Sequence, residues 1–151
     1  MAPCKLGPYT SAHLVRVRRN IVTERRKILV VDDQVEIREL AETILASEGY
    51  AMKTAASGDE ALDAVLGEPF DLVLLDINMP RMSGWETLRL MRADGALDDL
   101  AVVMFSIKGE IRDKSQGMQL GAVDYITKPF QVDELVGRVR DVFRSLEGAA
   151  S

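Results

Sequence analysis

Carboxylate, hydroxyl and ammonium groups stand at the ends of four short apolar runs of this sequence. The residues that carry these groups are Asp32, Asp33, Asp76, Ser106 and Lys128. The runs are rich in Val, Ile and Leu and are followed by turn or helix-start residues, a pattern typical of buried parallel strands. Because the carboxyl ends of parallel strands meet at one edge of a sheet, where such folds bind ligands, we expect the five groups to converge there.

The three aspartates of this set would repel one another unless a cation lay among them. Oxygen ligands with room for water suit Mg²⁺ better than zinc. The lysine supplies a second positive charge, so the group still missing from the site is an anion. The set therefore predicts a site that places a phosphoryl group on a carboxylate.

Strand and helix patterns alternate along the chain, which predicts an α/β fold with a parallel sheet. The predicted strands cover residues 27–32, 51–55, 71–76, 101–106 and 123–127. Three predicted helices cover residues 35–47, 85–93 and 111–120. Another starts at the capping box of Ser57 and Glu60 and ends near Gly67. The last helix carries an apolar stripe from Val132 to Leu146. Five strand–helix units then fill residues 27–147.

The composition is that of an ordinary globular domain. The chain has 151 residues, of which 47% are apolar and 28% charged, enough for one domain with a real core. It contains no run of 18 apolar residues and no secretory signal, so neither a membrane span nor export is expected. Its one cysteine, Cys4, has no partner for an internal disulfide, and a cytoplasmic location is expected.

Charge is distributed unevenly along the chain. Residues 1–27 hold seven basic residues and one acidic residue, whereas the net charge of the whole chain is −5. The body of the protein is therefore acidic, which disfavours direct DNA binding, because DNA affinity depends largely on neutralising phosphates. Residues 1–26 lack hydrophobic periodicity, and we interpret them as a basic extension that is either disordered or an upstream over-annotation.

The motifs together resemble the receiver domain of two-component response regulators. The resemblance covers residues 27–146 and rests on motifs that occur in the family's order: Val31-Asp32-Asp33, Leu75-Asp76-Ile77-Asn78-Met79-Pro80, Met82-Ser83-Gly84, Ser106, and Tyr125-Ile126-Thr127-Lys128-Pro129-Phe130. It implies a flavodoxin-like receiver fold, in which a doubly wound, five-stranded parallel sheet has the strand order 2-1-3-4-5. A receiver domain at residues 27–147 with a short tail at 148–151 indicates a single-domain regulator of the chemotaxis or relay type.

The resemblance assigns Asp76 as the phosphoacceptor, whose carboxylate oxygen attacks phosphorus and forms an acyl phosphate. It implies that Mg²⁺ is held by Asp33, Asp76 and the backbone carbonyl of Asn78, with Asp32 acting through a bound water. Lys128 would contact the phosphoryl oxygens as a point charge.

The resemblance also implies a switch. Ser106 would hydrogen-bond a phosphoryl oxygen on Asp76, and Tyr125 would then turn from an exposed to a buried rotamer. A cis peptide bond before Pro129 would aim Lys128 inward. The readout surface would comprise the helix at 111–120, the strand at 123–127 and the last helix.

The partners follow from the same family. The only histidine, His13, lies in the extension, so the phosphoryl donor is expected to be a sensor histidine kinase or a histidine phosphotransfer protein. The output would be binding of an effector protein. The protein would catalyse only its own Mg²⁺-dependent phosphorylation and dephosphorylation, and in that sense is not an enzyme.

One departure from the family pattern leaves alternatives open. Ile107 follows the strand-four hydroxyl where the family usually has Ala or Gly, and its branched side chain could slow phosphorylation, hydrolysis or both. Ile107 also favours the alternative that the protein is a phosphorylation-independent interaction module. A phosphatase of the haloacid dehalogenase type is disfavoured, because that family needs a second Asp where this chain has Asn78.

Overall fold

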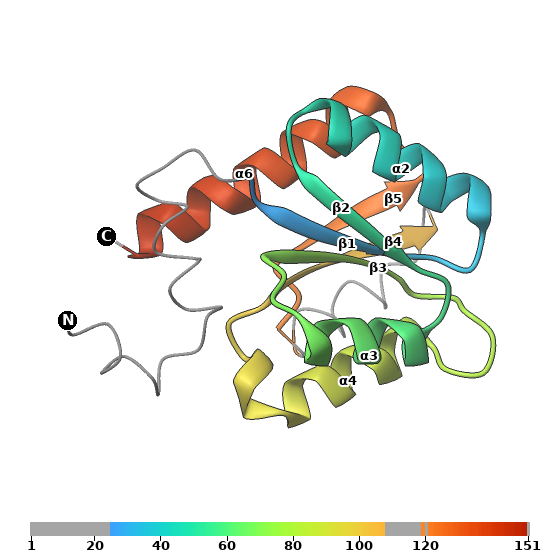
Figure 1. The fold of residues 1–151 in the computed structure, drawn as a ribbon. Coiled ribbons are helices and arrows are strands. Elements are labelled where there is room, and N and C mark those ends of the chain that lie inside the picture. The colour runs from blue at the N-terminus through green and yellow to red at the C-terminus, as the bar shows by residue number, and fades with distance from the viewer. Residues whose placement is uncertain (1–24, 108–118, 120, 151) are drawn as a thin grey trace.

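A five-stranded parallel sheet forms the centre of the computed structural model, which describes residues 25–107, 119 and 121–150 (Figure 1). The strands are β1 (Lys27–Val31), β2 (Ala51–Ala55), β3 (Leu72–Asp76), β4 (Ala101–Ile107) and β5 (Asp124–Lys128). Their order in the sheet is β2-β1-β3-β4-β5, and every neighbouring pair is parallel. The predicted fold class and strand order are confirmed.

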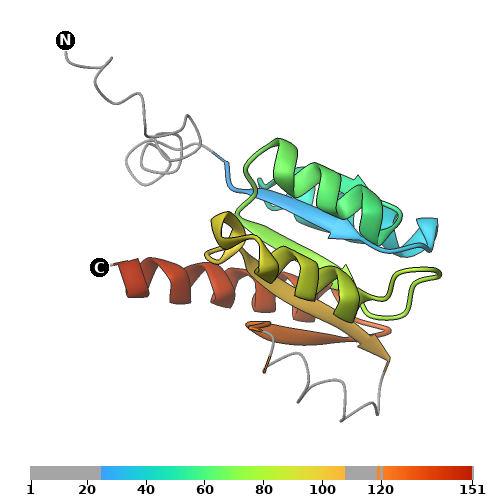
Figure 2. The same ribbon diagram turned by 90° about the horizontal axis from the view of Figure 1, so that it is seen from below.

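Helices cover both faces of this sheet (Figures 1 and 2). The described helices are α2 (Val35–Ser47), α3 (Gly58–Gly67), α4 (Gly84–Ala93) and α6 (Val132–Ala150), with a short 3-10 helix at Gly95–Leu97. Helices α2 and α6 lie on one face, and α3 and α4 lie on the other. The helix predicted over 111–120 lies, apart from Gln119, outside the described residues.

Two apolar cores result, one on each face of the sheet. On the α2 and α6 side, Leu45 and Leu135 pack with inward residues of the central strands such as Phe105. On the α3 and α4 side, Val65 and Leu88 pack with the alternate residues of the same strands. Strand β3 is buried along its whole length because it lies in the middle of the sheet with helices on both sides.

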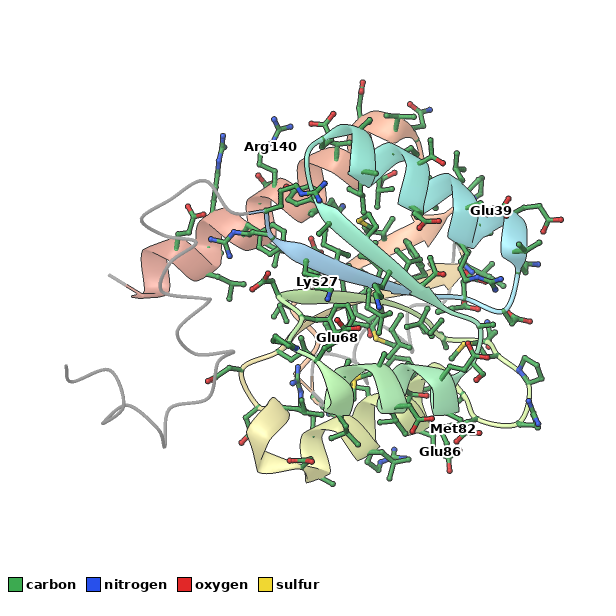
Figure 3. All side chains as sticks on the ribbon, in the orientation of Figure 1. Lys27, Glu39, Glu68, Met82, Glu86 and Arg140 are labelled. Atoms are coloured by element: carbon green, nitrogen blue, oxygen red, sulfur yellow. The ribbon has the colours of Figure 1, made fainter. Side chains whose placement is uncertain are left out.

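Local sequence signals explain most of the element boundaries. Ser57 accepts a hydrogen bond from the backbone N–H of Glu60 at 3.2 Å, and the Glu60 carboxylate accepts one from the Ala56 N–H at 2.9 Å. This capping arrangement starts α3, as the sequence predicts. At the amino end of the sheet, Lys27 forms an ion pair with Glu68 next to the end of α3 (Figure 3).

Candidate functional site

The carboxyl edge of the sheet brings the predicted aspartates together. In the parallel pairing of β1 with β3, Val31 lies opposite Leu75. Asp32, the next residue after Val31, is therefore level with Asp76, the last residue of β3. One carboxylate oxygen from each of Asp32, Asp33 and Asp76 lies within 4.8 Å of the others.

The three carboxylates differ in their exposure. Asp32 is completely buried and Asp76 is 4% exposed, whereas Asp33 is exposed to solvent. A site made of carboxylate oxygens alone, open to water on one side, fits the ligand preferences of Mg²⁺. Its donor set would suit zinc poorly, because it has no nitrogen or sulfur ligand.

Lys128 bridges two of these carboxylates. Its Nζ donates to Oδ2 of Asp32 at 2.6 Å and to Oδ1 of Asp76 at 2.9 Å. Burial by itself would lower the pKa of Lys128, but its hydrogen bonds to Asp32 and Asp76 outweigh burial and raise that pKa. The ammonium therefore stays charged at the centre of the site.

The strand ends and an aromatic stack position this lysine. Lys128 is the last residue of β5, where it lies opposite Ile107 in the register with β4. The peptide bond between Lys128 and Pro129 is cis, as the resemblance implied. Phe130 stacks on Phe105 at 5.5 Å between ring centroids, and Nζ of Lys128 lies 5.7 Å from the Phe105 centroid.

Asp76 has an unusual carboxyl group in this arrangement. Burial raises its pKa to about 6, and the charge of Asp32 adds to this effect. The hydrogen bonds from Lys128 and from the backbone N–H of Asn78 act in the opposite direction and only partly offset it. The anionic form of Asp76 is therefore costly here and would be stabilised by a further positive charge.

The loop after Asp76 is held close to the strand by Gly84, the first residue of α4. The Gly84 N–H donates to the Ile77 carbonyl at 2.8 Å. A Cβ atom at Gly84 would lie 2.2 Å from the carbonyl oxygen of Asp76 and 2.8 Å from Cα of Ile77. Only glycine allows the helix and the backbone of Asp76 to approach this closely.

Arg38 is a residue of the site that the sequence analysis did not identify. Its Nη1 donates to the backbone carbonyl of Asp32 at 2.7 Å from the second turn of α2. The sequence signal was weak, because an arginine near a helix start usually lies in solvent. A contact to a backbone carbonyl also has no characteristic residue pattern in the sequence.

Of the remaining predicted residues, the structure describes the side chains of Tyr125 and Ile107 but not that of Ser106. Ser106 lies in β4 opposite Thr127 of β5, but its side chain is outside the described part of the structure. Tyr125 is buried, with 6% exposure, in the core on the α3 and α4 side, so its predicted change of rotamer stays a prediction. Ile107, at the end of β4, is 51% exposed, and its predicted effect on rates also stays a prediction.

Comparison with known proteins agrees with this fold. The family model of the response regulator receiver domain matches residues 28–140. The chain is 40% identical over 126 residues to a probable transcriptional regulator, ycf27, of Guillardia theta, covering 83% of this chain and 48% of that protein. It is 41% identical over 114 residues to the transcriptional regulatory protein DltR of Streptococcus agalactiae, covering 76% of this chain and 50% of that protein.

A solved structure shows the same similarity. The chemotaxis response regulator CheY4 of Vibrio cholerae matches with a TM-score of 0.75 and 31% identity, covering 79% of this chain and 99% of that one. The chain therefore belongs to the response regulator receiver domain family of two-component systems. Members of this family are in general signalling switches that are phosphorylated and bind Mg²⁺ at an acidic pocket.

Two further facts concern the length of the chain relative to its relatives and its helices. It spans about half the length of the curated transcriptional regulators that it matches. Among the described residues, no helix is both long enough and apolar enough to cross a membrane.

Proposed function

We propose that this protein is a phosphorylation-controlled signalling switch in which Asp76 is the phosphoacceptor. The observation that carries the proposal is the bridge from Lys128 to the buried Asp32 and Asp76, beside the exposed Asp33. This arrangement presents an attacking carboxylate with a fixed positive charge next to it. An ordinary surface cluster of acids has no such partly buried cation.

In the proposed reaction, an oxygen of the Asp76 carboxylate forms a bond to phosphorus as the bond between phosphorus and the donor's imidazole nitrogen breaks. The products are an acyl phosphate on Asp76 and the donor's imidazole, whose released nitrogen takes up a proton to give the neutral ring. Lys128 would keep a positive charge beside the transferring oxygens. The hydroxyl of Ser106 would hydrogen-bond one of those oxygens once the acyl phosphate has formed, with Tyr125 packing behind it.

The acidic residues would hold Mg²⁺ for this reaction. Asp33, Asp76 and the backbone carbonyl of Asn78 would bind the ion, and Asp32, already bonded to Lys128, would act through a water. Bound Mg²⁺ offsets the negative charge of the phosphoryl oxygens. The exposed carboxylate of Asp33 leaves the ion accessible to a donor, in agreement with the position of the site at the sheet edge.

We propose a sensor histidine kinase or a histidine phosphotransfer protein as the donor, and an effector protein as the target. The target would bind the face formed by the predicted helix at 111–120, β5 and α6. Residues 27–147 would form the receiver unit, with 1–26 as a basic extension. The tail predicted at 148–151 begins within α6, which continues to Ala150. Phosphorylation and dephosphorylation of itself would be its only catalysis, and a cytoplasmic location and the lack of direct DNA binding stay predictions.

The proposal is tested by incubating the protein with acetyl phosphate and following its intact mass. A phosphoryl adduct is expected with Mg²⁺ and not with EDTA, and it should be absent from Asp76→Asn. Asp71→Asn is the matched control, because Asp71 is also a buried carboxylate beside β3 but lies at the opposite end of that strand. An adduct that forms equally on Asp76→Asn would overturn the assignment of the phosphoacceptor.

A further inference from the structure

Asp32 is fixed in the structure at each of its polar atoms. Its backbone N–H donates to the Ala55 carbonyl at 3.2 Å, and its Oδ1 accepts from the Gln34 N–H at 2.9 Å. Its Oδ2 accepts from Lys128 at 2.6 Å, and its backbone carbonyl accepts from Arg38 at 2.7 Å. Three of these bonds come from the backbone or from Lys128, and only the last depends on a side chain that the sequence analysis did not place in the site.

The contact from Arg38 is unusual for a helical arginine. Arg38 is the fourth residue of α2, and its side chain is half-buried as it reaches back across six positions to Asp32. Arginine side chains lose considerable freedom when they are held in this way. The bond therefore restricts both the start of α2 and the peptide unit after Asp32.

That peptide unit also sets the direction of Asp33. The carbonyl of Asp32 and the N–H of Asp33 belong to one planar group, so fixing the carbonyl fixes the plane from which Asp33 continues. Within the described residues, the Asp33 carboxylate forms no hydrogen bond or ion pair of its own. Its position thus depends on its backbone, and the backbone on that side is held by Arg38.

We propose that Arg38 is a positioning residue of the metal site, which sets the affinity for Mg²⁺ by holding the Asp32–Asp33 peptide in place. The inference rests on the proposed function only in taking these aspartates as the Mg²⁺ site. Arg38 donates to a backbone carbonyl and not to a metal ligand's carboxylate. It acts on Mg²⁺ affinity through the orientation of Asp33.

Positioning and charge predict opposite changes in Mg²⁺ affinity when Arg38 is removed, which makes the proposal testable. Arg38 is a cation near a cation site, so by charge alone its removal would strengthen Mg²⁺ binding. If positioning dominates, its removal weakens binding, and loss of a residue that orients metal ligands typically costs 10-fold or more in affinity.

The experiment measures Mg²⁺ affinity by titration calorimetry on the wild type, Arg38→Met and Arg38→Lys. Arg38→Met should bind about 10-fold more weakly, whereas Arg38→Lys, which keeps a charge and a donor, should lose less. Arg140→Met is the matched control, since Arg140 is an exposed arginine of α6 that lies away from the carboxyl edge of the sheet (Figure 3). It should bind Mg²⁺ as the wild type does.

Each outcome decides the matter. Equal or tighter binding by Arg38→Met would overturn the positioning role while leaving the proposed function intact. A wild type that binds no Mg²⁺ would overturn the proposed function and this inference together. If Arg38→Met folds only partly, its affinity can be obtained from the dependence of the urea midpoint on Mg²⁺ concentration, because the ion binds only the folded state.

Discussion

At the scale of single residues, the negative charges of the site exceed its positive charge. Asp32 and Asp76 are buried and share the one ammonium of Lys128. The pKa of Asp76 rises to about 6 because burial and the neighbouring Asp32 outweigh the contribution of Lys128. A reactive anion held at a cost in stability is suited to accept a bond to phosphorus, because that bond removes part of its charge.

This balance predicts the effect of Asp76→Asn on stability. The folded-state pKa of Asp76 lies above its ordinary value of 3.8, so its contribution to stability is present below about pH 4 and is lost as the pH rises through 6. The uncharged variant avoids that loss. In EDTA at pH 7.5, its free energy of unfolding should exceed that of the wild type by about 2 kcal/mol.

Urea unfolding between pH 4 and pH 8 measures this difference. The advantage of Asp76→Asn should shrink as the pH falls toward 4, where the wild-type carboxyl is also neutral. A variant that is less stable than the wild type at pH 7.5 would show that the pair with Lys128 outweighs the cost of burial.

The sequence predicted the chemical groups of the site but not how they are held. Strand-end positions were sufficient to bring Asp32, Asp76 and Lys128 to one edge, because parallel strands have that property in common. The role of Arg38 was missed, since it depends on a side chain reaching a backbone carbonyl. Such contacts follow from the path of the chain and not from residue type.

At the scale of elements, the approach of α4 to the end of β3 gives the site its rigidity. Ser83 starts the helix by accepting from the Glu86 N–H, and Gly84 lies against the backbone of Asp76. Within the intervening loop, Arg81 adopts a left-handed conformation with φ of 68°. The start of α4 and the backbone of Asp76 therefore cannot move independently.

Gly84→Ala should destabilise the protein by about 2 kcal/mol, because its Cβ would overlap the Asp76 carbonyl and either the strand or the helix must shift. The matched control is Gly137→Ala in α6, where a Cβ would meet no atom within 4 Å. That change should stabilise the protein by about 0.5 kcal/mol, since alanine favours the helix.

Thermal or urea unfolding of the two glycine variants decides this point. Equal stability of Gly84→Ala and the wild type would mean that the loop yields easily, and the rigid link between α4 and Asp76 would have to be abandoned. The same variant should also accept a phosphoryl group more slowly, because the shift reaches the backbone of the acceptor.

The element boundaries show where sequence patterns are sufficient. Helix α2 and strand β2 have the predicted bounds, because each lies between clear turn residues. Strand β1 ends at Val31, one residue before the prediction, since the Asp32 carbonyl turns to Arg38. Leu40 falls at helical spacing with the buried residues Ala41 and Ile44 but is 46% exposed, because it lies at the edge of the apolar arc that they form.

At the scale of the whole molecule, two cores hold the sheet rigidly and fix the spacing of its carboxyl edge. Strands β1, β3 and β4 are covered on both faces, so the groups that follow them have little freedom to separate. The repulsion among the aspartates is therefore stored in the folded protein. A ligand that relieves it should stabilise the entire fold.

Mg²⁺ should accordingly raise the free energy of unfolding of the wild type. At a concentration 100 times the dissociation constant, the increase should be about 2.7 kcal/mol. Asp33→Asn should lose most of this increase because it removes an exposed ligand, whereas Asp99→Asn, which changes an exposed aspartate outside the site, should keep it. The measurement is the urea midpoint with and without Mg²⁺, and an equal increase in both variants would mean that the ion binds elsewhere.

The central claim is that the phosphoryl group is carried by Asp76. Borohydride reduction converts an aspartyl phosphate to homoserine, so peptide mass spectrometry after phosphorylation and reduction identifies the modified residue directly. We predict homoserine at position 76 in samples treated with acetyl phosphate and Mg²⁺, and unmodified Asp32 and Asp33. Homoserine at either of those two positions, with Asp76 intact, would contradict the account.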